Sequence, residues 1–142
     1  MADDSPADDS PADADRLMAT MPFPGLIGIQ AVAASKDEVR ARIEWNDRLC
    51  TAGGVLHGGV LMSLADSAGA IRALLNLPEG SMTSTIESRT NLLRAVRQGH
   101  VEAIARPLHV GRTVIVVETE LKDDDGRLVA KTIQIQAVLA AG

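Results

Sequence analysis

Aromatic residues are nearly absent from this 142-residue chain, in which Phe23 and Trp45 are the only two. Proteins that bind single-stranded nucleic acid stack its bases on aromatic side chains, and binding to a phosphate backbone requires positive charge. The chain instead carries a net charge of −5. Both deficits argue against a nucleic-acid partner.

Cysteine and long apolar runs are also scarce. Cys50 is the single cysteine, so no internal disulfide can form and a secreted disulfide framework is disfavoured. No run of about 18 apolar residues is present, so no transmembrane helix is expected. The N-terminus lacks the basic start and apolar stretch of a secretory signal. We therefore expect a cytoplasmic protein without a membrane partner.

Positive charge is missing from residues 1–15, which contain six aspartates and repeat the motif ADDSP. Low hydrophobicity and charge of one sign are typical of disordered segments. The composition therefore predicts a disordered acidic leader over residues 1–15. The remaining residues, 16–142, are enough for one domain with a buried core.

The first half of that domain is predicted to form a short helix and a hairpin. An amphipathic helix begins at Arg16 and is broken at Pro22 and Pro24, and the chain is expected to be extended from Ile27. Apolar and polar residues then alternate on either side of the polar turn SKDE, residues 35–38. This period of two predicts two antiparallel strands with one buried face.

One long helix and four further strands are predicted in the second half. Apolar residues follow helical spacing from about residue 58 to residue 77, before Pro78 and Gly80. Extended segments follow at 82–96, 100–110, 112–122 and 127–140, joined by short turns. In the last of them Thr132, Gln134 and Gln136 lie opposite an apolar set. The economical fold is α+β, with a curved antiparallel sheet wrapped around the small-residue helix.

The start of that helix, HGGVLMSLAD, combines glycines with a carboxylate. Gly58 leaves backbone N–H groups of the first turn unshielded, and these can stabilise an oxyanion. Asp66 has no cationic neighbour three or four residues away. We expect it to be partly desolvated, which makes a carboxylate a stronger base. The alternative is that Asp66 simply faces solvent.

The spacing of these two residues constrains any joint action. Gly58 and Asp66 are eight positions apart on one helix, a distance of about 12 Å, so one carbonyl group cannot contact both. If the two act together, they must come from different subunits. An antiparallel pair of helices in a homodimer would then create two equivalent shared sites.

The stretch GGVLHGGVLMSLADSAGA resembles the His-Gly-Gly helix start of hotdog-fold acyl-CoA thioesterases, in particular the PaaI-like (phenylacetate-degradation type) group. The downstream GRT and DG-LVA motifs are similar to the same family. The resemblance implies hydrolysis of acyl-CoA to a free acid and CoA by a homodimer, or by a tetramer made of two dimers. It also implies that the catalytic acid and the oxyanion donor come from different subunits.

Individual roles follow from the resemblance. Asp66 matches the catalytic acid, acting as general base or nucleophile, and Gly58 matches the oxyanion donor. His57 matches a histidine that shapes the loop, and Thr85 matches a residue that holds the attacking water. Thr51 stands where the family commonly has asparagine. The coenzyme A contacts implied by the resemblance are Leu92, Arg94, Arg97, His109, Gly111, Arg112 and Thr113.

Other functions remain open at this point. A non-catalytic acyl-CoA-binding module on the same fold would not depend on Asp66. A hotdog hydratase usually pairs an aspartate with a histidine on the helix, and no histidine lies there. His100 and His109 have no metal-ligand spacing with His57 or Cys50, so no metal is expected. No other cofactor is expected either, because CoA belongs to the substrate.

Overall fold

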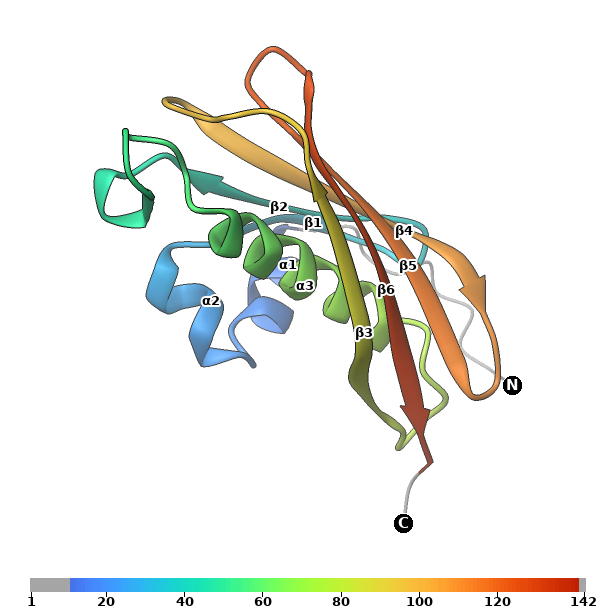
Figure 1. Cartoon of the computed structure of the whole chain (residues 1–142). Helices are drawn as coiled ribbons and strands as arrows, with labels where there is room; N and C mark the ends of the chain where they lie inside the picture. The colour runs from blue at the N-terminus through green and yellow to red at the C-terminus, as the bar shows by residue number, and fades with distance from the viewer. Residues whose placement is uncertain (1–10, 141–142) are drawn as a thin grey trace.

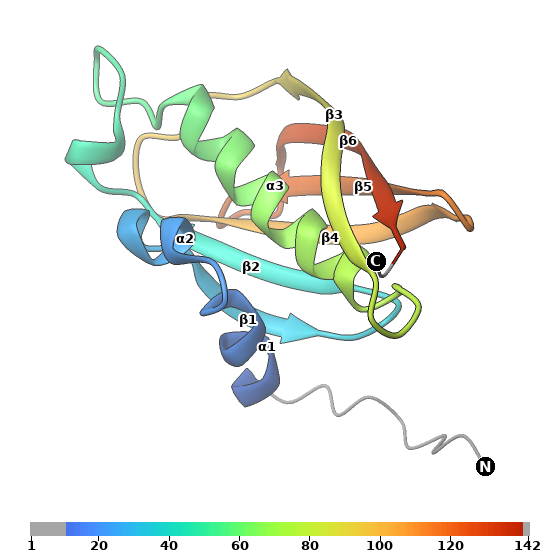
Figure 2. The same ribbon diagram turned by 90° about the horizontal axis from the view of Figure 1, so that it is seen from below.

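A computed structural model describes residues 11–140, which form a six-stranded antiparallel sheet curved around one long helix (Figure 1). The elements are α1 (Pro11–Met18), α2 (Pro22–Ile27), β1 (Gln30–Ala34), β2 (Val39–Glu44), a 3-10 turn η1 (Asp47–Leu49), α3 (Gly58–Leu74), β3 (Met82–Leu92), β4 (His100–Val110), β5 (Val114–Lys122) and β6 (Leu128–Leu139). The sheet order is β1-β2-β4-β5-β6-β3. Helix α3 lies across the concave face (Figure 2). The predicted α+β architecture is confirmed.

The N-terminal region differs from its prediction. Residues 1–10 of the predicted leader lie outside the described residues, but residues 11–15 belong to α1, where Ala14 is buried. The helix therefore extends into the predicted leader. Pro22 does not break a helix but begins α2, because a helix's first turn has no use for the missing N–H. The chain becomes extended only at Gln30.

The remaining elements lie close to their predicted ranges. The hairpin of β1 and β2 is confirmed, with Val39, Ala41 and Ile43 on its buried face. Helix α3 begins at Gly58 as predicted and ends at Leu74, three residues before the predicted end. Strand β3 ends earlier than predicted because the next two N–H groups both donate to the Val129 carbonyl.

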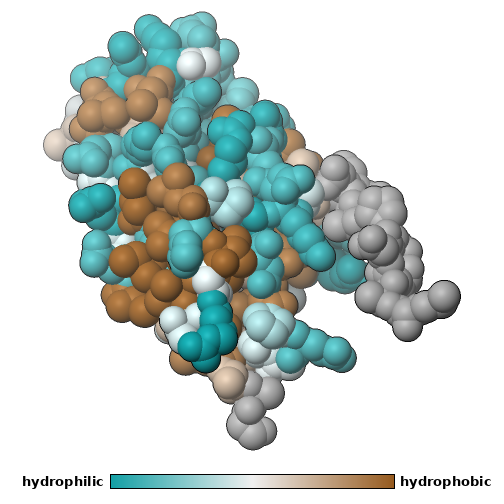
Figure 3. Space-filling model, turned by 90° about the vertical axis from the view of Figure 1, so that its right-hand side faces the viewer, coloured by the Kyte–Doolittle hydropathy of each residue, from teal (hydrophilic) through white to brown (hydrophobic). Residues whose placement is uncertain are grey.

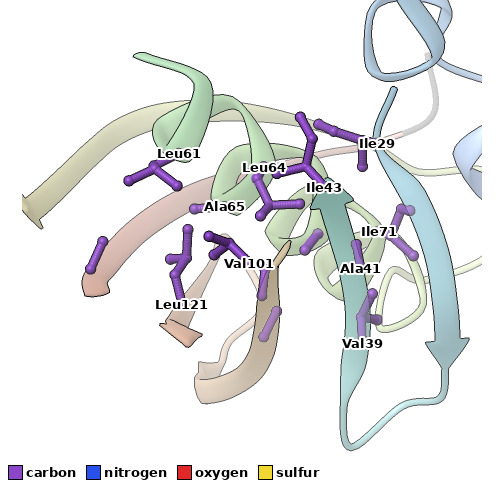
Figure 4. Close-up of a cluster of buried hydrophobic side chains, with 14 of the residues drawn as sticks. Ile29, Val39, Ala41, Ile43, Leu61, Leu64, Ala65, Ile71, Val101 and Leu121 are labelled. Carbon is purple, nitrogen blue, oxygen red and sulfur yellow. The ribbon is translucent and has the colours of Figure 1, made fainter. Parts of the chain in front are cut away.

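The hydrophobic core fills the space between α3 and the concave side of the sheet (Figure 4). Leu61, Leu64 and Ile71 project from the helix toward strand residues such as Ile43 and Val101, and all five are at most 4% exposed. Small residues allow the close packing expected from the sequence. This packing places α3 at a fixed distance from β6.

Strand β6 buries its polar face. The sequence correctly predicts which residues share a face of the strand, but it does not predict which face is buried. Thr132, Gln134 and Gln136 lie under α3, each at most 1% exposed. Ile133 and Ile135, on the other face, are only partly buried. A strand that presents amide side chains to the interior must satisfy their hydrogen bonds. The Nε2 atoms of Gln134 and Gln136 find their acceptors at the candidate site, whereas Gln134 Oε1 has no partner among residues 11–140.

Two charged groups away from that site bear on stability. Arg72 of α3 is 2% exposed, and its Nε and Nη1 atoms have no partner among residues 11–140. Burial lowers the pKa of Arg72, and the charge of Asp37 offsets this only in part. At the start of β2, burial raises the pKa of Glu38, but hydrogen bonds and charges from Arg40 and Arg106 lower it by more, to below its usual value.

Candidate active site

Helix α3 begins with a hydrogen-bond donor that has no partner within residues 11–140. His57 is the N-cap, and its Nδ1 accepts the Gly59 N–H at 2.8 Å, so the neutral ring carries its proton on Nε2. The His57 carbonyl accepts the N–H groups of Val60 and Leu61. The N–H of Gly58 is left without a partner among the described residues. It is a free donor at the positive end of the helix.

A groove beside Gly58 collects several of the predicted residues. It is lined by Thr51, Val55, Leu56, Gly58, Leu61, Leu92, Leu93, Arg94 and Ala95. Leu92 lies closest to the helix start, since a Cβ atom added to Gly58 would be 2.6 Å from Leu92 Cδ1. The structure thus brings Thr51, Leu92 and Arg94 together at the free N–H of Gly58.

The carboxylate of Asp66 lies in a second groove, which Met62, Ser63, Thr85 and Ser88 also line. Its Oδ1 atom accepts the Thr85 hydroxyl at 3.1 Å and the Gln134 amide at 3.0 Å. The structure therefore places Thr85 beside Asp66, while its predicted role in holding the attacking water stays a prediction. The expected partial desolvation is wrong for a single protomer, because Asp66 is exposed beside strand β3.

Two site residues were missed by sequence reasoning. Gln134 donates directly to Asp66, and Gln136 Nε2 donates to Thr85 Oγ1 at 2.8 Å. The available signal was the pattern TIQIQ, which places two amides on one face of a strand. The pattern alone does not show that this face of the strand is the buried one.

The two grooves do not form a single site in one protomer. Gly58 and Asp66 are eight residues apart on one continuous helix, or about 12 Å. Beside them runs β3, an edge strand that pairs only with β6. Met62 on α3 and Met82, Ile86, Leu92 and Leu93 on or just after β3 are all exposed. The catalytic candidates therefore border an apolar surface and an unpaired strand edge.

The residues proposed to contact coenzyme A fall into two groups. Leu92 and Arg94 lie at the N-terminal end of α3. His109 lies near the end of β4, and Gly111, Arg112 and Thr113 form the turn to β5, where the Thr113 carbonyl accepts the N–H of Val138 near the end of β6. These two groups lie at opposite ends of the sheet (Figure 1). One protomer does not bring them together.

Arg97 lies in a different setting from Arg94. It lines a shallow pocket with Asp123, Asp124 and Asp125 of the turn between β5 and β6. These carboxylates pair with Arg127 and His100. The phosphate contact of Arg97 stays a prediction.

Within residues 11–140, no group of three or more histidine, cysteine or acidic side chains is placed to hold a metal ion. None of the helices there has the length and apolarity needed to cross a bilayer.

Solved structures place this fold in a known class. The chain superposes on thioesterase HI1161 from Haemophilus influenzae with a TM-score of 0.84 and 28% identity, covering 92% of this chain and 90% of that structure. A single-residue variant of thioesterase PA1618 from Pseudomonas aeruginosa gives a TM-score of 0.84 and 31% identity, covering 89% and 94% of the two chains. The fold is therefore the hotdog fold of thioesterases.

Sequence similarity identifies the family. Residues 53–130 match the family model described as the thioesterase superfamily. A Haemophilus influenzae relative, whose name places it among the esterases, is 33% identical over 102 residues, which are 72% of this chain and 74% of the relative. The chain belongs to the thioesterase superfamily. This membership supports a hydrolase that acts on thioesters.

Proposed function

We propose that this protein hydrolyses acyl-CoA thioesters to a carboxylic acid and CoA at sites shared between two protomers. The proposal rests on two groups of helix α3. The Gly58 N–H has no partner among the described residues, and the Asp66 carboxylate accepts a hydrogen bond from Thr85. The helix holds the two groups about 12 Å apart. Antiparallel packing of two α3 helices would bring Asp66 of one protomer to Gly58 of the other. Membership of the thioesterase superfamily supports the reaction class.

The chemistry requires a donor for the carbonyl oxygen and a carboxylate for attack. The Gly58 N–H would donate to the thioester oxygen, whose negative charge grows as the tetrahedral intermediate forms. Asp66 would either take a proton from the attacking water or attack the carbonyl carbon itself. In either route the C–S bond breaks and the CoA sulfur leaves. His57 would keep the helix start in shape through its bond to the Gly59 N–H.

The surface around α3 and β3 favours a second copy of the chain as the partner. An edge strand with unpaired backbone groups and an apolar border is a ready template for pairing, and β3 has this character. The outer face of the sheet carries partly exposed Val114, Val116, Ile133 and Ile135, and Figure 3 displays apolar surface gathered on this side. We propose a homodimer through α3 and β3, and a dimer of dimers as the larger assembly.

A dimer would also unite the two groups of coenzyme A contacts. With the α3 helices antiparallel, the β4–β5 turn of one protomer would approach the N-terminal end of α3 in the other. Arg94 would then meet His109, Gly111, Arg112 and Thr113. A guanidinium and a tight turn suit the phosphates of CoA.

The acyl group has a candidate groove on the other side of the helix start. That groove is lined by Phe23, Ile27, Arg48, Leu49, Cys50, His57, Gly59, Val60 and Ser63. Its apolar members come from α2, from the end of η1 with the residue that follows it, and from α3. We infer that this groove takes the acyl chain, while the groove with Arg94 takes the pantetheine arm.

Thiol release from a panel of acyl-CoA substrates tests the proposal. Replacement of a general base typically costs 10²–10⁴-fold in rate, so Asp66→Asn is expected to lose at least about 10²-fold in kcat. Glu79→Gln, which changes an exposed carboxylate beyond the end of α3, is the matched control. Full activity of Asp66→Asn would contradict the catalytic assignment. Tight CoA binding without any thiol release would instead support a non-catalytic acyl-CoA-binding module.

A further inference from the structure

Two buried glutamines are connected to Asp66 by hydrogen bonds, Gln134 directly and Gln136 through Thr85. We infer that Gln134 and Gln136 of β6 are positioning residues, which orient the Asp66 carboxylate so that its Oδ2 atom faces the thioester. Neither glutamine lines the grooves at Gly58 or Asp66, so both act through Asp66. The inference rests on the proposed catalytic role of that residue.

Gln134 makes the direct contact. Its Nε2 lies 3.0 Å from Asp66 Oδ1, and because a carboxylate only accepts hydrogen bonds, the NH₂ end of the amide must face it. Gln134 is 0% exposed. A donor held inside the core cannot turn toward water, so Oδ1 keeps this partner while the carboxylate itself stands at the surface.

Gln136 acts one step further away, through Thr85. Its Nε2 donates to Thr85 Oγ1 at 2.8 Å, and Thr83 Oγ1 lies 3.1 Å from its Oε1. A hydroxyl has one proton. Since Thr85 accepts from Gln136, its proton is free to point to Asp66 Oδ1 at 3.1 Å. The second bond to Asp66 is therefore directed by a residue 51 positions away from Thr85.

Gly69 makes room for this arrangement. A Cβ atom at position 69 would lie 1.9 Å from Gln134 Oε1 and 2.5 Å from its Cδ. No larger residue fits there while the amide keeps its position. The glycine on α3 and the glutamine on β6 are thus matched to each other across the helix–sheet interface.

The consequence concerns which oxygen of Asp66 can react. Both donors reach Oδ1, and Oδ2 has no partner among the described residues. A carboxylate that is held at one oxygen presents its other oxygen in a defined direction before the reaction begins. The carboxylate then has no rotational freedom to lose in the reaction itself. Oδ2 is then the atom that takes the proton of water or attacks the thioester carbon.

Steady-state kinetics of Gln134→Met test the inference. Methionine has a similar size but no hydrogen-bond donor. Loss of a hydrogen bond to a charged group changes an equilibrium or a rate by roughly 10- to 100-fold. We expect kcat to fall by about that factor with KM changed less than about twofold, because the substrate does not touch Gln134. In an Asp66→Asn background the same substitution should have no further effect on kcat.

Thr132→Val is the matched control. Thr132 lies on the same face of β6, is equally buried and bonds to Thr90 at 2.7 Å instead of to Asp66. Its loss should leave kcat within about twofold of wild type. If Gln134→Met does not fold, Gly69→Ala gives the same test, because the added Cβ displaces the amide without removing it. Gln136→Met should lower kcat by a smaller factor, about three- to tenfold.

The outcomes separate the inference from the proposed function. Full activity of Asp66→Asn contradicts the proposed function. An inactive Asp66→Asn together with unchanged kcat in Gln134→Met overturns the inference alone. Additive losses in the double variant also overturn it, since they indicate a general structural effect. Loss of kcat that vanishes in the Asp66→Asn background supports it, as does a crystal structure of Gln134→Met in which the carboxylate has turned.

Discussion

Mixing two inactive variants tests whether Gly58 and Asp66 serve a common site from different protomers. Gly58→Pro removes the N–H and nothing else of chemical importance. Proline suits the first helical position, and the preceding His57 already has the extended conformation that proline requires, with φ −61° and ψ 135°. Gly58→Ala is the control, because it adds the same Cβ next to Leu92 but keeps the donor.

The expected losses follow from the geometry. Removal of one oxyanion donor typically costs about 10²–10³-fold in kcat, and Asp66→Asn at least about 10²-fold. Each homodimer is therefore nearly inactive. A heterodimer of the two variants has one site with both defects and one site with neither. Its activity should be about half that of the wild-type dimer.

Heterodimers are obtained by co-expressing the two variants with different affinity tags and purifying through both. Thiol release from the best acyl-CoA substrate is then measured at saturating concentration. If Gly58 and Asp66 instead acted within one chain, both sites of the heterodimer would be defective and the activity would stay near zero. That result would refute the shared site, as would full activity of a stable monomer.

Three further predictions concern other parts of the chain. Because the pKa of folded Glu38 lies below its ordinary value of 4.5, its stabilising effect is present above that pH and is lost as the pH falls through the lowered pKa. Glu38→Gln should cost about 1 kcal/mol in urea unfolding at pH 7 and almost nothing in acid, and an equal cost at both pH values would contradict this. Arg72→Met should stabilise the protein by about 1 kcal/mol, because it removes two buried donors without partners, and a lower free energy of unfolding would show the guanidinium to be paired. Phe23→Ala should shift the ratio of kcat/KM toward longer acyl chains by about tenfold, whereas an unchanged ratio would place the acyl group elsewhere.

Much of the fold was predictable because its signals are local. The two-residue alternation in β2 and β5 and the helical spacing of α3 depend on neighbours a few positions apart. The N-cap at His57 is encoded in the same short stretch as the helix. The N-terminus was predicted less well for the same reason. A proline such as Pro22 can end a helix or occupy its first position, and the packing of α1 on β1 and of α2 on α3 decides between the two.

The sequence by itself determined the helix start at Gly58, the position of Asp66 on that helix and the spacing that keeps the two apart in one chain. These are matters of residue type and rise per residue. Only the tertiary structure decided that the amide face of β6 lies under α3 and that Gln134 reaches Asp66 across 68 positions. The physical reason is that alternation along a strand distinguishes two faces, whereas the packing of the whole sheet against the helix selects which face is buried.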